Sequence, residues 1–497
     1  MEVFVPLLDG FTVALTPLNL AYLSAGVLMG TVVGILPGLG PTAGIAILLP
    51  ATLNVEPVTA IMMLAAIYYG AMYGATITAI LINTPGVPAV MASTFDGHPL
   101  ARQGRAGAAL VMQAVASFTG GMTGLLLLAL LAPFATTLAT RFGPPEFFML
   151  SAAGMLAIGA ILGTERRSGI LSALIGFALA TIGLDVGSGQ PRFTFGTAEL
   201  LAGVPFIPLA IGVFGVGEIL SATHEGGTRE TNDRGARDSG GELPTKDEWA
   251  ESRPAMLRGS AIGFLIGVVP GVGATLASLL AYGVEKGRST SPERFGAGAM
   301  PGLAAPEAAN NAAASGAMVP LLMLGVPGSA ATAVLLGALL TWGLVPGPLL
   351  MTENPDFAWG LIASMALGNV ALLAVSLGAV RVFAKIAQIP RGVAAPVVIV
   401  LCVVGAAASA GTFGMTVMWA GGLLGFAMKR FGFSTPAMII GFVLAPLAED
   451  SLRQTLVISG GSPAIFMERP VALLIGLLTL AAIVRGPLRA SLPKGST

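Results

Sequence analysis

An interrupted apolar segment that occurs twice is the feature that most constrains how this chain can fold. Residues 34–44 read Gly-Ile-Leu-Pro-Gly-Leu-Gly-Pro-Thr-Ala-Gly, and residues 267–275 read Gly-Val-Val-Pro-Gly-Val-Gly-Ala-Thr. Apolar or small residues run into and out of each copy without a charge. Proline removes a backbone donor and glycine relaxes the backbone, so each copy predicts a broken helix with free N–H and C=O groups.

The composition places these breaks in a membrane protein. The chain has 497 residues, of which 55% are hydrophobic and only 10% are charged, and its mean hydropathy is +0.85. Because lipid cannot satisfy free backbone groups, a break must face protein, water or a ligand. Matched breaks in two halves are typical of a transporter's binding site. The alternative is that the glycines only permit tight helix packing.

Charge and the reactive residue types exclude several classes of protein. Acidic and basic residues balance at 25 each, so no basic surface indicates a nucleic-acid partner. There is one cysteine, Cys402, and the two histidines, His98 and His224, are far apart in sequence. We therefore expect no cofactor and no metal beyond Na⁺ as a coupling ion. No Gly-x-Ser-x-Gly, His-Glu-x-x-His or nucleotide-binding Gly-x-x-x-x-Gly-Lys-Ser/Thr motif occurs, so no catalytic residue is assigned.

The second half of the chain repeats the order of the first. The Pro-Gly-x-Gly copies are 233 residues apart; Gly70-Ala71-Met72 is matched to Gly316-Ala317-Met318, and Thr84-Pro85-Gly86 to Val326-Pro327-Gly328. Ordered matches of this kind indicate an internal duplication. The predicted division is a first membrane repeat (1–222), a charged cytoplasmic linker (223–258), a second membrane repeat (259–450), and a final span with the C-terminal tail (451–497).

The positions of lysine and arginine predict that the two repeats have opposite orientations. Basic residues, which prefer cytoplasmic loops, follow alternate elements in the two halves: Arg102, Arg105, Arg166 and Arg167 in the first; Lys286, Arg288, Arg294, Arg381, Lys385, Arg391, Lys429 and Arg430 in the second. Four arginines are exceptions to this pattern: Arg141, Arg192, Arg453 and Arg469. The predicted fold is an all-α polytopic membrane protein of about 11–12 spans, built from two inverted-topology repeats with Pro-Gly-broken or re-entrant helices.

The two Pro-Gly-x-Gly tips are the predicted substrate site. Exposed N–H groups at the start of a half-helix suit a carboxylate. The residues assigned to substrate binding are Gly38, Leu39, Gly40, Pro41, Thr42, Gly271, Val272, Gly273, Ala274 and Thr275.

A second set of polar residues is predicted to bind a coupling ion. It lies at or before a second pair of breaks and comprises Asn83, Thr84, Asn310, Asn311 and Glu307. Amide, hydroxyl and carboxylate oxygens are hard donors that suit Na⁺, and an ionisable residue within a span indicates function. The alternative for the asparagines is a helix cap or a hydrogen bond between helices.

Several longer motifs resemble the large membrane subunit of the bacterial tripartite tricarboxylate transporters. They lie at residues 34–42, 68–74, 83–86, 96–104, 189–196, 269–273, 306–311, 446–450 and 459–461. The resemblance covers nearly the whole chain. It implies a multi-pass secondary carrier of the bacterial cytoplasmic (inner) membrane that works with a small integral-membrane subunit and a periplasmic solute-binding protein.

The same resemblance implies a di- or tricarboxylate substrate, such as citrate, whose import is driven by a Na⁺ or H⁺ gradient. The motifs do not distinguish among carboxylates. An intramembrane enzyme acting on a lipid-like substrate is the alternative, and it would need a catalytic acid, nucleophile or metal cluster within the spans. A channel is a third alternative, although duplicated breaks suit a closed midplane site better than a continuous pore.

Overall fold

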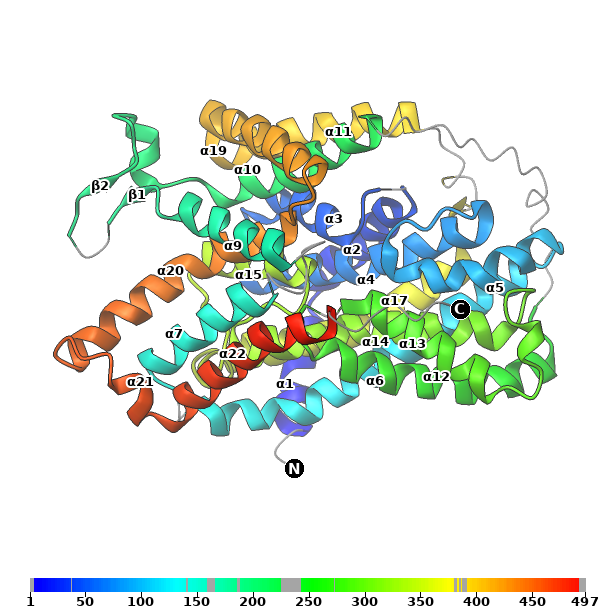
Figure 1. The fold of residues 1–497 in the computed structure, drawn as a ribbon. Coiled ribbons are helices and arrows are strands. Elements are labelled where there is room, and N and C mark those ends of the chain that lie inside the picture. Colours follow the sequence, from blue (N-terminus) through cyan, green and yellow to red (C-terminus); the bar gives the residue numbers. More distant parts are fainter. Residues whose placement is uncertain are drawn as a thin grey trace. The chain divides into compact units, whose positions relative to one another are not determined.

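The computed structural model of this chain describes residues 4–36, 38–139, 142–158, 166–185, 188–224, 243–271, 273–379, 382–383, 386 and 391–490. Almost all regular structure in these ranges is helical (Figure 1). Seven of the described helices are long and apolar enough to cross a membrane. The prediction of an all-α polytopic membrane protein is therefore confirmed.

The helices up to residue 224 are α1 (Phe4–Ala14), α2 (Pro17–Ile35), α3 (Pro41–Leu48), α4 (Pro57–Ile82), α5 (Met91–Arg102), α6 (Ala106–Ala139), α7 (Pro144–Ala153), α9 (Arg166–Ala180), α10 (Phe206–Ile211) and α11 (Gly217–His224). The later helices are α12 (Lys246–Gly267), α13 (Gly273–Arg288), α14 (Met300–Leu324), α15 (Ala330–Thr341), α16 (Leu350–Glu353), α17 (Pro355–Gly378), α19 (Arg391–Arg430), α20 (Thr435–Ile458), α21 (Ile465–Glu468) and α22 (Pro470–Ala490). Two short strands, β1 (Gly183–Leu184) and β2 (Pro191–Arg192), form an antiparallel pair.

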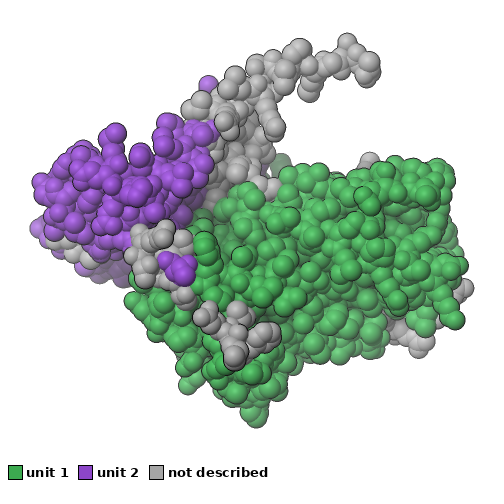
Figure 2. Space-filling model, turned by 90° about the horizontal axis from the view of Figure 1, so that it is seen from below, with its two compact units in different colours: residues 1–135, 207–426 green, residues 136–206, 427–497 purple. Residues whose placement is uncertain are grey.

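The chain forms two compact units, and each takes residues from both halves of the sequence (Figure 2). Unit 1 comprises residues 1–135 and 207–426, and unit 2 comprises residues 136–206 and 427–497. Helix α12 begins at Lys246, inside the range 223–258 that the sequence assigns to the linker. Residues 225–242 of that range lie outside the described residues.

Helices end at all four positions where the sequence predicts a break. Helix α2 ends at Ile35 before α3 begins at Pro41, and α12 ends at Gly267 before α13 begins at Gly273. Helix α4 ends at Ile82 and is followed by Asn83, whose φ of 51° is left-handed, and α14 ends at Leu324 and is followed by Gly325, whose φ of 71° is also left-handed. A left-handed residue after the last turn is a common way to stop a helix.

In both halves, the helix before the first break packs in the same way against the helix before the second break. A Cβ atom added at any of six glycines would lie 2.2–2.5 Å from a carbonyl oxygen of the facing helix, so the paired backbones are in direct contact. The facing pairs are Gly26 and Met63, Gly30 and Ile67, and Gly34 and Ala71 between α2 and α4, and Gly259 and Ala305, Gly263 and Ala309, and Gly267 and Ala313 between α12 and α14. Small residues permit such close approach. The glycines that precede the breaks therefore permit tight helix packing, which the sequence offered as the alternative to a binding site.

This packing changes one of the sequence matches by a helical turn. Gly74 of α4 faces Thr31, and Gly316 of α14 faces Phe264, which lies 233 residues after Thr31. Gly74, rather than Gly70, is thus the counterpart of Gly316. The match of Gly70 to Gly316 was wrong because a Gly-Ala pair occurs at both 70–71 and 74–75. Contacts with the partner helix decide between them.

Candidate functional site

The two breaks of each half contact one another within unit 1. In the first half, a Cβ atom added at Gly40 would lie 2.4 Å from Cγ1 of Val87. In the second half, the Gly271 N–H donates to the carbonyl oxygen of Gly328 over 3.1 Å. The φ angles of Gly38 and Gly271 are 94° and 83°, which a residue with a Cβ rarely adopts.

The predicted substrate-binding residues lie around these contacts. Leu39, Pro41 and Gly271 are buried, whereas the others that the structure describes are half-buried: Gly38, Gly40, Thr42, Gly273, Ala274 and Thr275. Val272 lies outside the described residues. The carbonyl oxygen of Thr275 accepts a hydrogen bond from the Ser278 hydroxyl over 3.1 Å.

The helix that follows each tip contacts the other half of the chain. The Ser278 hydroxyl of α13 donates to the carbonyl oxygen of Ala89 over 2.7 Å, in the short 3₁₀ segment (Pro88–Val90) of the first half's second break. Helix α3 packs against α15 of the second half. The hydroxyls of Tyr68 on α4 and Ser329, the N-cap of α15, are 3.4 Å apart. The breaks of both halves are thus joined to one another in unit 1.

The most distinctive polar group in unit 1 is Glu307, whose side chain is completely buried on α14. Its Oε2 accepts from the hydroxyls of Thr76 at 2.8 Å and Ser93 at 3.2 Å. Its Oε1 accepts from the hydroxyl of Ser117 at 2.8 Å and from Nδ2 of Asn311 at 3.1 Å. We call these five residues, contributed by α4, α5, α6 and α14, the Glu307 cluster.

The Glu307 cluster has the chemistry of a cation site. Among the described residues, no lysine, arginine or histidine pairs with Glu307. A buried carboxylate without a counter-ion is costly, even when hydrogen-bond donors partly offset the loss of water. If the hydroxyl hydrogens turn away, the same oxygens present hard donors to Na⁺. Alternatively, a proton can neutralise the carboxylate directly.

The structure brings together only part of the predicted ion-binding set. Asn311 and Glu307 are in contact, and the adjacent Asn310 is completely buried, with neither polar atom of its side chain hydrogen-bonded. Asn83 is exposed at the end of α4. The Thr84 N–H and hydroxyl donate to the carbonyl oxygens of Thr78 and Ile82 at the end of α4. The last residue of α4, Ile82, is six residues beyond Thr76, roughly 9 Å along the helix axis.

Comparison with known proteins identifies the family. The sequence model of the tripartite tricarboxylate transporter TctA family matches residues 20–440. The chain belongs to this family. The TctA family is one of transporter subunits, so membership implies transport rather than catalysis, with partner subunits and a periplasmic binding protein. Among the described residues, no group of three or more His, Cys, Asp or Glu side chains could hold a metal ion.

Two relatives of this TctA-family chain come from Agrobacterium vitis. The "Uncharacterized 52.8 kDa protein in TAR-I ttuC' 3'region" is 40% identical over 476 residues, covering 96% of this chain and 94% of the relative. The "Uncharacterized protein in TAR-II ttuC' 3'region" is 38% identical over 224 residues, covering 45% of this chain and 93% of that relative. No solved structure matches.

Further buried polar atoms without hydrogen bonds occur in unit 1 of this TctA-family chain. Besides Asn310, they include Gln113 Oε1, Asn311 Oδ1 and Asn369 Oδ1. Native proteins satisfy most buried polar groups, so unpaired ones call for a particular explanation. Polar side chains that are ready to bind an ion, a substrate or water provide one.

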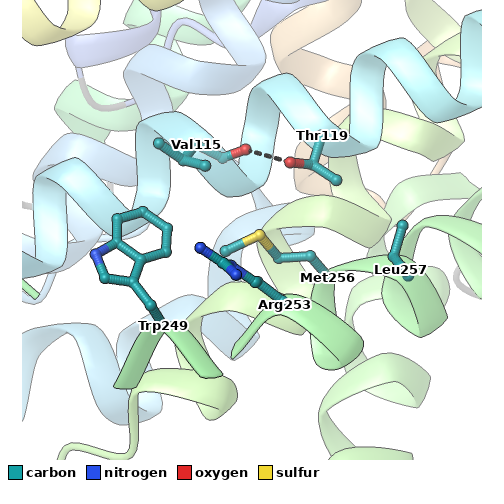
Figure 3. Close-up of a pocket in the computed structure, with 6 residues that line it drawn as sticks. All are labelled: Val115, Thr119, Trp249, Arg253, Met256 and Leu257. Atoms are coloured by element: carbon teal, nitrogen blue, oxygen red, sulfur yellow. Dashed lines mark hydrogen bonds between the residues drawn. The ribbon is translucent and has the colours of Figure 1, made fainter. Parts of the chain in front are cut away.

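A cavity of about 510 Å³ lies elsewhere in unit 1, between α6 and α12 (Figure 3). Its lining residues are Val115, Thr119, Trp249, Arg253, Met256 and Leu257. The Thr119 hydroxyl donates to the carbonyl oxygen of Val115 over 2.8 Å rather than into the cavity. None of the residues that the sequence assigns to substrate or ion lines it, so we do not assign it to the transport site.

Proposed function

We propose that this chain is the carrier subunit that imports a citrate-like di- or tricarboxylate across the bacterial cytoplasmic membrane. In this proposal a periplasmic solute-binding protein delivers the substrate, a small integral-membrane subunit completes the complex, and a Na⁺ or H⁺ gradient drives uptake. Family membership supports the transport class. The single observation that carries the ion-driven mechanism is the buried carboxylate of Glu307, which pairs with no basic side chain among the described residues.

The breaks supply what a carboxylate substrate requires. Helices α3 and α13 begin directly after Gly40 and Val272, and their first N–H groups have no partner within the helix. Such helix starts bind anions. Because Gly38 and Gly271 adopt left-handed conformations without side chains, the backbone can approach a ligand closely there.

The Glu307 cluster supplies what coupling requires. A multivalent anion is expensive to move through a low-dielectric region, and cations that bind with it offset that cost. Glu307 lies on α14, whose far end forms the second break beside Gly271. Occupation of Glu307 by a cation can therefore act on the element that contacts the substrate tip.

Uptake in proteoliposomes tests the proposal. The chain, its small membrane partner and the binding protein are reconstituted, and a panel of radiolabelled carboxylates is offered while Na⁺ and H⁺ gradients are imposed separately. We expect uptake of a di- or tricarboxylate to depend on one of the two gradients. Glu307→Gln keeps the shape of the side chain but removes its charge, so this variant should lose gradient-driven accumulation.

Glu293→Gln is the matched control, because Glu293 is exposed on the loop before α14. It should transport at the wild-type rate. Accumulation of carboxylates by Glu307→Gln with unchanged cation dependence would exclude Glu307 from coupling. Absence of carboxylate uptake by the wild-type complex under either gradient would refute the proposed function itself.

A further inference from the structure

The segment between α9 and α10 forms a hairpin in unit 2. Strands β1 and β2 pair Gly183 with Arg192 and Leu184 with Pro191. The turn is closed by hydrogen bonds from the Gly189 N–H to the Asp185 carbonyl oxygen, at 2.7 Å, and from the Ser188 N–H to the Asp185 carboxylate, also at 2.7 Å. Residues 186–187 of the turn lie outside the described residues. We call residues 183–185 and 188–203 the hairpin segment.

Charged side chains hold the hairpin segment against α20. Arg192 donates through both Nη atoms to the carboxylate of Glu449, at 2.7 and 3.2 Å. Arg453, one turn further along α20, donates to Glu449 at 2.8 Å and also to Asp185. The hydrogen bond from Arg453 holds the pKa of Asp185 well below its ordinary value. Two acids and two arginines thus neutralise one another and fix the base of the segment.

Two phenylalanines of the hairpin segment are exposed next to these ion pairs. Phe193 and Phe195 have φ angles of 53° and 50°, in the left-handed region that few residues with a Cβ occupy. Their side chains are 64% and 85% exposed, whereas Thr194 between them is buried. Such strained backbone persists only where the surrounding structure enforces it. The hairpin segment therefore keeps two large apolar rings exposed at the expense of local backbone strain.

The basic residues of unit 2 indicate on which side of the membrane the segment lies. Helix α9 begins at Arg166 and Arg167, and α20 follows Lys429 and Arg430, so each starts at a basic pair typical of the cytoplasmic side. The two helices run in the same direction, since Ser172 contacts Ser434 and Gly176 faces Met438. Helix α9 ends at Ala180, shortly before the hairpin segment, and the segment contacts Glu449 and Arg453 in the C-terminal half of α20. The segment therefore lies toward the ends of these helices that are opposite the basic pairs, which indicates the periplasmic side.

We propose that the hairpin segment is a docking surface for the periplasmic solute-binding protein, with Phe193 and Phe195 as its two anchors. This inference rests on the proposed function, which requires such a protein to meet the carrier on the periplasmic side. Aromatic anchors dominate the energy of many protein interfaces. A lipid or the small membrane subunit would instead be expected against the spans, whereas the two phenylalanines lie outside every described candidate span.

Asparagine substitutions test the two anchors without changing the backbone, because asparagine tolerates the left-handed conformation. The wild-type complex and the double variant Phe193→Asn/Phe195→Asn are placed in nanodiscs, and the affinity of purified, carboxylate-loaded binding protein is measured by biolayer interferometry. We expect affinity to fall at least about tenfold. Phe431→Asn is the matched control, since Phe431 is also 72% exposed but follows the basic pair at the cytoplasmic start of α20.

A photo-crosslinking amino acid at position 195 identifies the occupant directly. An adduct with the binding protein supports the proposal, whereas adducts only with the small subunit or with lipid overturn it. Unchanged affinity of the double variant, in a complex that transports normally, also overturns it. If the wild-type complex neither binds the loaded protein nor takes up carboxylate, the proposed function fails instead, so the two failures are distinguishable.

Discussion

Arg105 and Glu248 form a two-bonded ion pair that ties the start of α6 to the first turn of α12. Arg105 donates through both Nη atoms to the two carboxylate oxygens, at 2.6 and 2.8 Å. Glu248 also caps α12 by accepting from the Thr245 N–H at 2.8 Å. The hydrogen bond from Arg105 lowers the pKa of Glu248 from its ordinary value of 4.5 to about 2. The Glu248 side chain therefore caps α12 and also links the two halves of the chain through Arg105.

Replacing the Glu248 carboxylate with an uncharged amide should make the stability of the folded protein less dependent on pH. Because the folded protein lowers this pKa, the stabilisation is complete above about pH 4.5 and is lost as the pH falls toward 2. We expect Glu248→Gln to destabilise the detergent-solubilised protein by about 1–2 kcal/mol at pH 7. The measurement is the unfolding midpoint of both proteins at pH 7 and pH 3.5, where the difference should shrink. Asp247→Asn, on the exposed neighbour, should change neither value, and a difference that grows at pH 3.5 would contradict the assignment.

The breaks could be predicted from sequence because proline and glycine act on their own backbone. The structure ends α2, α4, α12 and α14 at the expected positions. A helix stop depends on a few consecutive residues, so these residues carry the information locally.

The Glu307 cluster could be predicted only in part, because its contacts join distant parts of the chain. Asn311 is one turn from Glu307 on α14, and the sequence places the two together. Thr76 and Ser117 contact Glu307 across 231 and 190 residues. A hydroxyl in an apolar helix commonly bonds to its own backbone, as Thr78 does to Ala75, so residue type alone does not select Thr76. A hydroxyl residue on each helix that packs around a buried acid, as on α4, α5 and α6 around Glu307, is a signal that could predict such a cluster.

Adding a methyl group at Gly263 should separate α12 from α14. The new Cβ atom would lie 2.2 Å from the Ala309 carbonyl oxygen, and backbone cannot move aside as a side chain can. We expect Gly263→Ala to destabilise the protein by about 1–3 kcal/mol, the usual cost of overpacking. Gly283→Ala on α13 is the control, because no atom lies within 4 Å of its added Cβ, and it should be neutral or slightly stabilising. Equal thermal stability of the two variants would disprove the close packing.

Alanine at Gly38 tests whether the first tip approaches a ligand. Its left-handed φ of 94° disfavours any side chain, although the nearest atom to an added Cβ, Oε1 of Glu218, is 3.9 Å away. Gly104→Ala provides a control with similar strain, since Gly104 has a φ of 79° and no atom within 4 Å of an added Cβ. We expect both variants to accumulate in the membrane, but only Gly38→Ala to lose carboxylate uptake. Equal loss in both would attribute the effect to backbone strain.

Removing one hydroxyl from the Glu307 cluster should reveal which cation drives transport. Thr76→Val keeps the shape of the side chain but removes a hydrogen bond to a charged group, which is worth about 1.5–3 kcal/mol. If Na⁺ binds there, the variant loses an oxygen ligand, so the Na⁺ concentration for half-maximal uptake should rise roughly tenfold. If a proton binds, the carboxylate loses a donor that stabilises its charge, so the proton binds more tightly. The half-maximal pH of uptake should then move upward.

Thr78→Val is the control for Thr76→Val, because Thr78 is also buried on α4 but its hydroxyl bonds to the Ala75 carbonyl oxygen of its own helix. It should leave both dependences unchanged. A shift of equal size in both variants would mean that the helix, rather than the cation site, has been disturbed.

Asn311 and Thr84 should differ in their effect on coupling, although the sequence assigns both to the ion. Asn311 donates to Glu307 at 3.1 Å, whereas the Thr84 hydroxyl donates to Ile82 at the end of α4. We therefore expect Asn311→Ala to change the cation concentration for half-maximal uptake by roughly tenfold, more than it changes the corresponding substrate concentration, while Thr84→Ala changes the cation dependence little. The measurement is a two-dimensional titration of cation against carboxylate in proteoliposomes. If Thr84→Ala alters the cation dependence as much as Asn311→Ala does, the ion site must extend to the end of α4. If neither variant alters it, the Glu307 cluster is not the coupling site.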